Sequence, residues 1–417
     1  MARPPSPPPP GRPRHLRAGD LRALAQLATQ ATLGVIGITE GVHQAVRHRV
    51  GLPAGAAEGR TGGLTGRVYG AVRGVAHGLG SGIDGALRAL LPLLDRPAEA
   101  DADSPAREAV LAALNGVLGD RLVALGNGLA QPMELREGGR VLPLRVDGPA
   151  DPAALRLQRP TPHLLLMLHG LCMNDLQWRR GGHDHTEVLA QALQATPVHL
   201  RYNSGLPIAA NGRALAERLE RLLSVWPAAL QGITLVGHSM GGLLARSAMH
   251  AGQRAGHRWP HRVRHLVFLG TPHHGAPLER AGHGADLLLA SSPFSAPLAR
   301  LGRLRSAGIT DLRHGQVRAA DEAAPEAPLP LPEGVVCLAV AACLASRRDL
   351  LADRLVGDGL VPLRSALGEH DDPARRLAFA RGNQRVVYRT GHLDLLSSPA
   401  VADQLRRWLA PPDASAG

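Results

Sequence analysis

The chain has 417 residues, a length that suits one large domain with an extension, and its 44% hydrophobic residues can form a sizeable core. The formal net charge is +12, and all 47 basic residues are arginine because the sequence contains no lysine. Uniform arginine alongside abundant Ala, Gly and Pro indicates a coding bias, and 2% aromatic residues cannot form a base-stacking surface, so a nucleic-acid partner is not expected.

Targeting signals and cysteines bound the cellular setting. The first twenty residues lack the apolar segment of a secretory signal, and no uncharged apolar run has the length of a membrane span. We therefore expect a cytoplasmic protein, with peripheral contact with an anionic membrane surface as the open alternative. The three cysteines lie in apolar settings, which predicts buried, reduced thiols.

The N-terminal third differs in character from the rest. Residues 1–16 are rich in proline and are expected to be disordered, and residues 17–130 carry apolar residues at helical spacing. Ser104 followed by Pro105 is typical of a helix start. The apolar side of that helix is predicted to comprise Val110, Leu114, Val117 and Leu118. The sequence thus predicts a helical N-terminal extension.

From residue 131 to 412 the pattern predicts one α/β domain. The run MELREGGRVLPLRV predicts a hairpin, and six short apolar strands then alternate with amphipathic helices: HLLLMLHG, VHLRY, ITLVG, VRHLVFLG, GVVCLAVAA and RVVYR. Fully apolar strands separated by helices indicate a mostly parallel sheet with helices on both faces. Residues 276–334 interrupt this alternation with an apolar, Arg-containing segment, which predicts a lid-like cap insertion, with a fixed insertion that walls the pocket as the alternative.

One serine has the setting of a catalytic nucleophile. Gly237, His238, Ser239, Met240 and Gly241 match the pattern Gly-x-Ser-x-Gly, and the pattern lies between a predicted strand and a predicted helix. In this position a strained turn exposes the serine hydroxyl, which an imidazole must then activate.

The base and the acid should follow the serine in the order acid, then histidine. His392 lies just past the last predicted strand, whereas His370 lies in a polar loop. Asp358 is flanked by glycines in a tight turn after the preceding strand, while Asp349 and Asp353 occupy an Arg- and Leu-rich helical stretch. Asp358 and His392 are therefore the predicted partners.

The tetrahedral oxyanion of acyl transfer needs backbone N–H donors. Met240, directly after the nucleophile, and Leu171, in the loop after HLLLMLHG, are the predicted donors. His169 and Gly170 are predicted to shape that loop, and His238 is assigned a supporting position beside the nucleophile.

Other histidines give weaker signals. His183 and His185 have a spacing that could bind a metal, but histidines are scattered along the whole chain, so no metal ligand is assigned. His273 and His274 are interpreted as loop packing near the site. No cofactor is expected.

Five motifs in order, LHG, GHSMGG, GTPHHGAP, VGDGLVP and GHLDLL, resemble the lipases of the α/β-hydrolase superfamily, specifically the bacterial triacylglycerol lipases and the GPI inositol-deacylase-like group. The resemblance covers residues 160–410. It implies the α/β-hydrolase fold, a Ser239, Asp358 and His392 triad, and a lipid-like ester as substrate. It also places Asp394 at the position of an aspartate that binds structural calcium in secreted relatives, although no second calcium aspartate is evident.

The predicted function is cleavage of carboxylic esters through an acyl-enzyme. Two alternatives stay open: an acyltransferase that uses the same triad with an alcohol as acceptor, and a catalytically inactive scaffold at a membrane surface.

Overall fold

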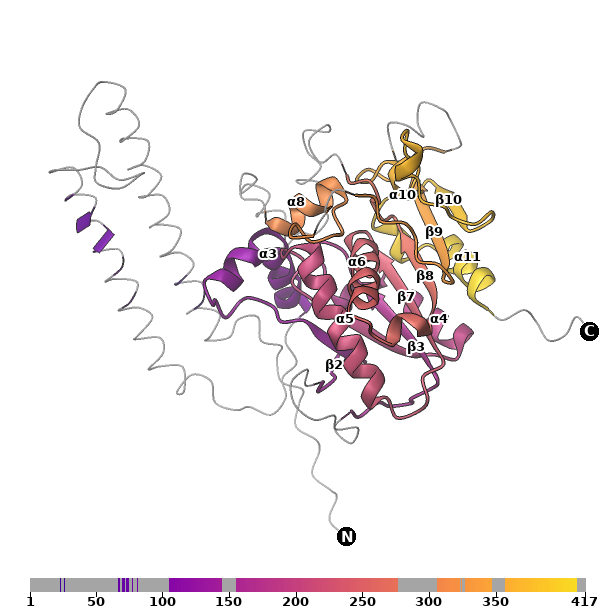
Figure 1. The fold of residues 1–417 in the computed structure, drawn as a ribbon, viewed down its shortest axis with the longest axis horizontal. Coiled ribbons are helices and arrows are strands. Elements are labelled where there is room, and N and C mark those ends of the chain that lie inside the picture. The colour runs from indigo at the N-terminus through magenta and orange to yellow at the C-terminus, as the bar shows by residue number, and fades with distance from the viewer. Residues whose placement is uncertain are drawn as a thin grey trace, which may run out of the picture. The chain divides into compact units, whose positions relative to one another are not determined.

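The computed structural model describes residues 105–144, 155–276, 306–346 without 323, 325 and 326, and 357–410, with isolated helical positions between residues 23 and 81 (Figure 1). The proline-rich tail, most of the predicted extension, and residues 277–305 of the predicted cap lie outside this part. Contact density separates two units, and the second comprises Glu108–Arg121 and Ala130–Gly417. The central part of helix α3 thus belongs to the same unit as the residues from 131 onward.

An eight-stranded sheet forms the centre of this unit, with the order β10-β9-β8-β7-β3-β6-β1-β2. The strands are β1 (Glu134–Glu137), β2 (Arg140–Val141), β3 (His163–Leu168), β6 (Thr196–Arg201), β7 (Gly232–His238), β8 (Val263–Leu269), β9 (Val336–Cys343) and β10 (Gln384–Tyr388). Strands β10 to β6 pair in parallel, whereas β1 is antiparallel to β6 and to β2. The predicted mostly parallel sheet and its hairpin are confirmed.

From Pro105 onward the described helices are α3 (Pro105–Ala124), α4 (His185–Leu193), α5 (Ile208–Val225), α6 (Met240–Arg254), α8 (Ala307–His314), α10 (Leu363–Ala366) and α11 (Pro399–Leu409). Short 3-10 helices are η2 (Asp175–Trp178), η3 (Trp259–Arg262), η5 (Pro373–Arg375) and η6 (Asp394–Leu396), and β4 (Arg179–Arg180) pairs with β5 (His183–Asp184) in a small ribbon. Helix α11 begins at Pro399, which suits the first turn because its missing N–H has no partner to lose there.

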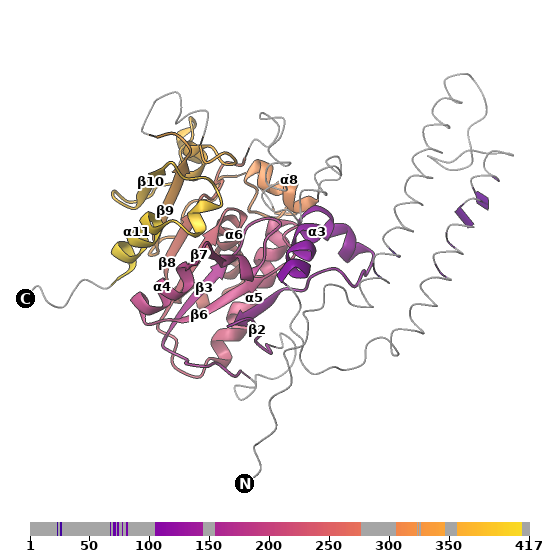
Figure 2. The ribbon, with the colours of Figure 1, turned by 180° about the vertical axis from the view of Figure 1, so that it is seen from behind.

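Helices cover both faces of the sheet (Figures 1 and 2). On one face, alternate residues of β3, β7, β8 and β9 form a buried cluster with Leu189 of α4 and with Val401, Leu405 and Leu409 of α11. Helices α5 and α6 pack against each other on the opposite face. Because both faces are covered, residues 164–168 of β3 are all buried, which explains its continuous apolar sequence.

Helix α3 contributes its central turns to this unit. Leu114, Val117 and Leu118 are buried as predicted, whereas Val110, one turn before Leu114, is 42% exposed. A Cβ atom on Gly116 would lie 2.2 Å from Cys172 Sγ, so only glycine lets the helix approach the loop after β3 this closely. All three cysteines are free and buried.

The chain reverses its direction of travel across the sheet at β3. It passes from β3 to the neighbouring β6, returns across β3 to β7, and then continues outward through β8, β9 and β10. The loops that follow β3 and β7 therefore diverge. A crevice at the carboxyl ends of these two strands is where open parallel sheets bind their ligands.

The described end of the predicted cap is attached to its surroundings. Ser306 Oγ donates a hydrogen bond to the Gly116 carbonyl at 2.6 Å, and the Ala307 N–H donates to Asp120 at 2.9 Å. Asp311 of α8 accepts from the Ile208 N–H at the start of α5 at 2.8 Å. Leu287, Leu288 and Leu289 of the predicted cap lie outside the described residues.

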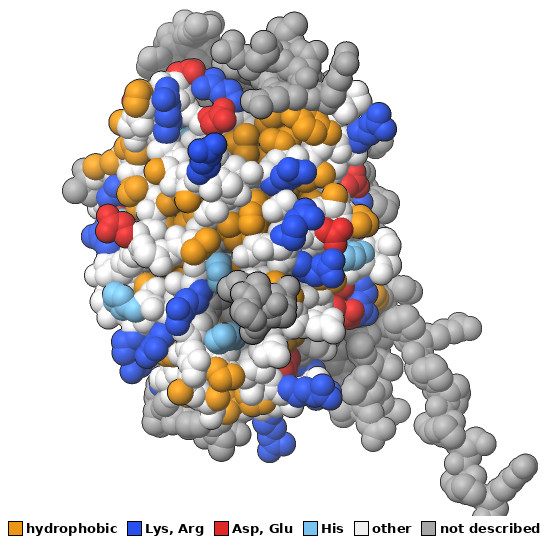
Figure 3. All heavy atoms as spheres, turned by 90° about the vertical axis from the view of Figure 1, so that its right-hand side faces the viewer, with side chains coloured by type: hydrophobic (Ala, Val, Ile, Leu, Met, Phe, Trp, Pro, Cys, Tyr) orange, Lys and Arg blue, Asp and Glu red, His pale blue; other side chains and the backbone are white. Residues whose placement is uncertain are grey.

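The described arginine side chains do not gather into one surface patch on the face shown in Figure 3. They lie scattered there among hydrophobic and acidic ones. Among the described helices, none has the length and apolar character needed to cross a membrane.

Candidate active site

Ser239 occupies the turn between β7 and α6. Its backbone has φ 54° and ψ −122°, a strained combination for a residue with a Cβ, and it is 3% exposed. A Cβ on Gly237 would lie 2.4 Å from the Gly242 nitrogen, and one on Gly241 would lie 2.2 Å from the Leu168 carbonyl oxygen. Glycine on both sides of the serine is therefore required by the close approach of α6 to β7 and β3.

Asp358 lies in a tight turn whose flanking Gly357 and Gly359 both have positive φ. Its Oδ1 accepts hydrogen bonds from the backbone N–H groups of Leu360 at 3.0 Å and Val361 at 2.8 Å. Its Oδ2 accepts from His392 Nδ1 at 2.7 Å. Both side chains of this pair are buried, and the His392 N–H also donates to the Asp358 carbonyl at 3.1 Å.

The hydrogen bond to Asp358 determines which nitrogen of His392 can act as a base. A carboxylate only accepts, so Nδ1 carries the proton and Nε2 presents its lone pair. His392 Nε2 is buried and has no hydrogen-bond partner among the described atoms. In unliganded enzymes the bond between a catalytic serine and its base is often long, and it tightens when substrate binds.

Backbone contacts link Ser239 with the Asp358–His392 pair. The Ser239 N–H donates to the Leu269 carbonyl at 2.8 Å, and the next residue, Gly270, approaches the pair so closely that a Cβ there would lie 3.2 Å from Asp358 Oδ2 and from His392 Cε1. His238, the other neighbour of the serine, donates from Nε2 to the His392 carbonyl at 3.1 Å. The structure therefore brings together the three residues predicted as a triad.

The two predicted oxyanion donors flank the same point. Met240 is the first residue of α6, where a backbone N–H has no partner within the helix and the helix dipole favours negative charge. The loop after β3 passes directly against the serine, since a Cβ on Gly170 would lie 3.2 Å from Ser239 Cβ. Leu171 follows in this loop and is buried.

His169 orients the loop that carries Leu171. The Tyr202 N–H donates to its Nε2 at 3.3 Å, so Nδ1 carries the proton and donates to the Gly170 carbonyl at 2.8 Å. Burial lowers the pKa of His169 to about 4, which keeps the ring neutral. Because the carbonyl and the next N–H of a trans peptide point in opposite directions, holding Gly170 O aims the Leu171 N–H away from His169.

Comparison with known proteins agrees with this topology. Residues 163–321, from β3 past Ser239 and into the predicted cap, match the sequence model of the PGAP1-like alpha/beta domain family. The chain has the α/β-hydrolase fold. The predicted resemblance to this superfamily is confirmed.

Solved structures of α/β hydrolases are similar to this chain at low identity. The mature lipase of Bacillus licheniformis is 20% identical, covering 61% of this chain and 96% of its own, with a TM-score of 0.39. The RedJ thioesterase of Streptomyces coelicolor is 20% identical over 66% of this chain and 96% of its own, with a TM-score of 0.34. A lipase-esterase related protein of Clostridium acetobutylicum is 16% identical over 59% and 94%, with a TM-score of 0.33. No curated protein matches the chain.

His183 and His185, whose spacing could have bound a metal, have other partners in the structure. His183 Nε2 and His185 Nδ1 are hydrogen-bonded to each other at 2.7 Å, and His185 Nε2 donates to the Leu395 carbonyl at 2.8 Å. Asp394 Oδ2 accepts from the Gly391 N–H at 3.0 Å. Within the part of the chain that the structure describes, no group of three His, Cys, Asp or Glu side chains is arranged to hold a metal ion.

Two residues at the site escaped sequence analysis. Tyr202 stacks on His169 with ring centroids 4.3 Å apart and donates its hydroxyl to the His169 carbonyl, yet it merely ends an apolar strand in sequence. Gly270, with φ 58°, directly follows β8 and lies beside the Asp358–His392 pair. The only sequence signal for Gly270 is a glycine at the end of the predicted strand that follows the helix after Ser239.

Proposed function

We propose that the chain is a serine hydrolase that cleaves carboxylic esters with lipid-like acyl groups. The observation that carries the proposal is the buried Asp358–His392 hydrogen bond beside the strained Ser239 turn, with an unpartnered lone pair on His392 Nε2. This is the arrangement that nucleophilic catalysis by serine needs.

In this mechanism His392 Nε2 takes the proton of Ser239 Oγ as that oxygen attacks the ester carbonyl. The N–H groups of Met240 and Leu171 stabilise the resulting oxyanion, and Asp358 stabilises the imidazolium. His392 then gives the proton to the leaving alkoxide as its bond to the carbonyl carbon breaks. The alcohol departs, and the acyl group remains on Ser239 Oγ as the acyl-enzyme. Water activated by the same nitrogen releases the acid and restores the serine.

The lipid-like acyl group is supported by the sequence of the cap insertion. Residues 276–334 contain Leu287, Leu288, Leu289, Phe294 and Leu298, which are more apolar than a solvated loop requires. The segment follows β8, whose carboxyl end lies at the ligand-binding edge of the sheet. A cap with these side chains would cover a hydrophobic acyl group, and peripheral contact with a lipid surface belongs to the same proposal.

The test is labelling with a fluorophosphonate probe, followed by hydrolysis of a chromogenic ester series from acetate to laurate. We expect the wild-type chain to be labelled and Ser239→Ala not to be, with kcat lowered on the order of 10⁴-fold or more. An unlabelled wild-type chain would refute a serine hydrolase. Equal kcat/KM across the series would refute only the lipid-like substrate, and products acylated on an added alcohol would identify an acyltransferase.

A further inference from the structure

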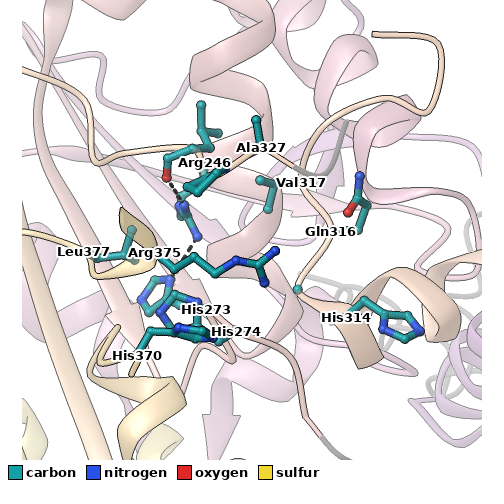
Figure 4. Close-up of a pocket in the computed structure, with 13 residues that line it drawn as sticks. Arg246, His273, His274, His314, Gln316, Val317, Ala327, His370, Arg375 and Leu377 are labelled. Atoms are coloured by element: carbon teal, nitrogen blue, oxygen red, sulfur yellow. Dashed lines mark hydrogen bonds between the residues drawn. The ribbon is translucent and has the colours of Figure 1, made fainter. Parts of the chain in front are cut away.

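A second concave site lies beside the catalytic one. A cavity of about 280 Å³ is lined from α6 by Arg246, from the loop after β8 by His273 and His274, and from η5 by Arg375 (Figure 4). None of the predicted triad residues lines it. The proposed ester cleavage does not use this cavity.

The lining is strongly basic. Two arginines and four histidines line the cavity, and no Asp or Glu is among its described lining residues. In Figure 4 the rings of His273, His274 and His370 lie together on one side of the cavity. The Arg375 side chain extends past these rings, and His314 lies on the opposite side. With two arginines and no carboxylate in its described lining, the cavity favours ligands of negative charge.

Arg246 gives the clearest indication of an anionic ligand. Its side chain is buried, one amino group donates to the Leu329 carbonyl and the other to His273 Nδ1 at 3.4 Å, and its Nε has no partner among the described atoms. None of the described carboxylates forms an ion pair with it. Burial lowers its pKa to about 10. A buried guanidinium without a carboxylate is costly, and a bound anion would offset that cost.

Two histidines supply neutral donors to the same cavity. Because Arg246 can only donate, His273 Nδ1 must accept, so its Nε2 carries a proton, and that nitrogen is buried without a partner among the described atoms. His370 Nδ1 accepts from the Asp372 N–H at 3.0 Å, so its Nε2 also carries a proton. Two cationic side chains and two imidazole N–H groups thus border one space.

We propose that this cavity binds a phosphate-type oxyanion, either as the headgroup of an ester substrate or as free phosphate. Donors from Arg246, His273, His370 and Arg375 approach from separate elements, which suits a tetrahedral anion with several acceptor oxygens better than a planar carboxylate. The cavity is about nine times the ~30 Å³ share of one liquid water, so a phosphate and part of the group that carries it have room.

The loop after β8 joins the cavity to the catalytic site. Gly270 lies against Asp358 and His392, and three residues later His273 lines the cavity. The His273 and His274 N–H groups are in turn hydrogen-bonded to Ser365, which fixes this loop on α10. An anion held here would therefore lie close to the ester-cleaving residues, although its binding does not require their activity.

The test is calorimetric titration of the full-length chain with inorganic phosphate at constant ionic strength. We compare wild type with Arg375→Gln and His273→Gln, and Arg407→Gln serves as a control because it removes the same charge from exposed Arg407 on α11. Loss of one charge-assisted hydrogen bond predicts phosphate Kd about tenfold higher in each cavity variant and unchanged in the control. The proposal is overturned if the wild type does not bind phosphate, or if both cavity variants bind it as wild type does.

Kinetics distinguish the two sources of phosphate. We compare an acylglycerol phosphate with the uncharged acylglycerol of the same chain length. If Arg375→Gln raises KM about tenfold for the phosphorylated ester alone, the cavity binds the headgroup of the substrate. If Arg375→Gln changes KM equally for both esters while the wild type still binds inorganic phosphate, the cavity binds free phosphate. Because phosphate binding should persist in Ser239→Ala, failure of the proposed hydrolase activity would leave the titration decisive.

Discussion

Replacing Asp358 by asparagine should stop catalysis by forcing His392 into the wrong tautomer. In the structure Asp358 Oδ1 accepts two backbone N–H groups while Oδ2 accepts from His392 Nδ1. An asparagine must keep its oxygen at the Oδ1 position, since an NH₂ group there would face two donors. Its NH₂ group then lies 2.7 Å from Nδ1, the distance that Oδ2 now occupies.

The magnitude follows from this exchange of donor and acceptor. With an NH₂ donor opposite Nδ1, the imidazole proton moves to Nε2, which can no longer accept the proton of Ser239. The same substitution in a serine protease triad lowers kcat about 10⁴-fold, equivalent to about 5.5 kcal/mol in activation free energy. Stability should change little, because the oxygen that caps Leu360 and Val361 is retained.

The assay is kcat on a soluble short-chain ester together with the rate of fluorophosphonate labelling. Asp358→Ala supplies a comparison: it leaves two N–H groups without an acceptor, at about 1–3 kcal/mol each, yet lets the ring adopt either tautomer. It should therefore be less stable but more active than Asp358→Asn. Asp394→Asn, which keeps an oxygen for the Gly391 N–H, should retain wild-type kcat. If Asp358→Asn keeps more than a tenth of wild-type kcat, or exceeds Asp358→Ala, the tautomer argument is refuted.

Three further predictions concern stability. Gly241→Ala should lower the free energy of urea unfolding by several kcal/mol and reduce activity, because its Cβ would lie 2.2 Å from the Leu168 carbonyl oxygen and α6 would have to move. The control Gly128→Ala, with open space around it, should lower the same free energy by about 1 kcal/mol or less. Equal losses in the two variants would contradict this account. Arg201→Met removes the buried cation that pairs with both Glu108 and Asp175, so the free energy of urea unfolding should fall by about 3–5 kcal/mol. The exposed control Arg407→Gln should lower it by less than about 0.5 kcal/mol. A comparably small loss for Arg201→Met would contradict the stabilising role of these buried ion pairs. His169 and His185 have pKa values of about 4 in the fold and 6.5 when unfolded, so between these pH values the unfolded state binds more protons. The free energy of unfolding should therefore fall as the pH is lowered from about 6.5 to 4, by up to ~3 kcal/mol for each histidine. Urea midpoints that stay constant over this range would contradict this prediction.

Local patterns account for what the sequence by itself determined. Six apolar strands, the hairpin at the Gly-Gly turn and the strand–serine–helix order are properties of neighbouring residues, and each appears in the structure where it was predicted. Val110 is the exception within α3: helical spacing placed it with Leu114 and Val117, but a helix packs only where a partner surface lies, and Val110 is exposed.

Contacts between distant segments were decided only by the tertiary structure. The strand order puts the loops after β3 and β7 at a divergence point, and this brings Leu171 and Ser239 together although 67 positions separate them in sequence. The tautomer of His169 depends on Tyr202, and that of His392 depends on Asp358, because a proton on an imidazole is placed by whichever group faces the opposite nitrogen. The basic cavity also depends on a contact between distant segments. The sequence indicated only loop packing for His273. In the fold, α6 places Arg246 against His273 Nδ1, which leaves the proton on Nε2 without a partner among the described atoms. Sequence specifies which donors and acceptors a chain carries, but packing selects their partners, since those partners lie on segments that meet only in the folded chain.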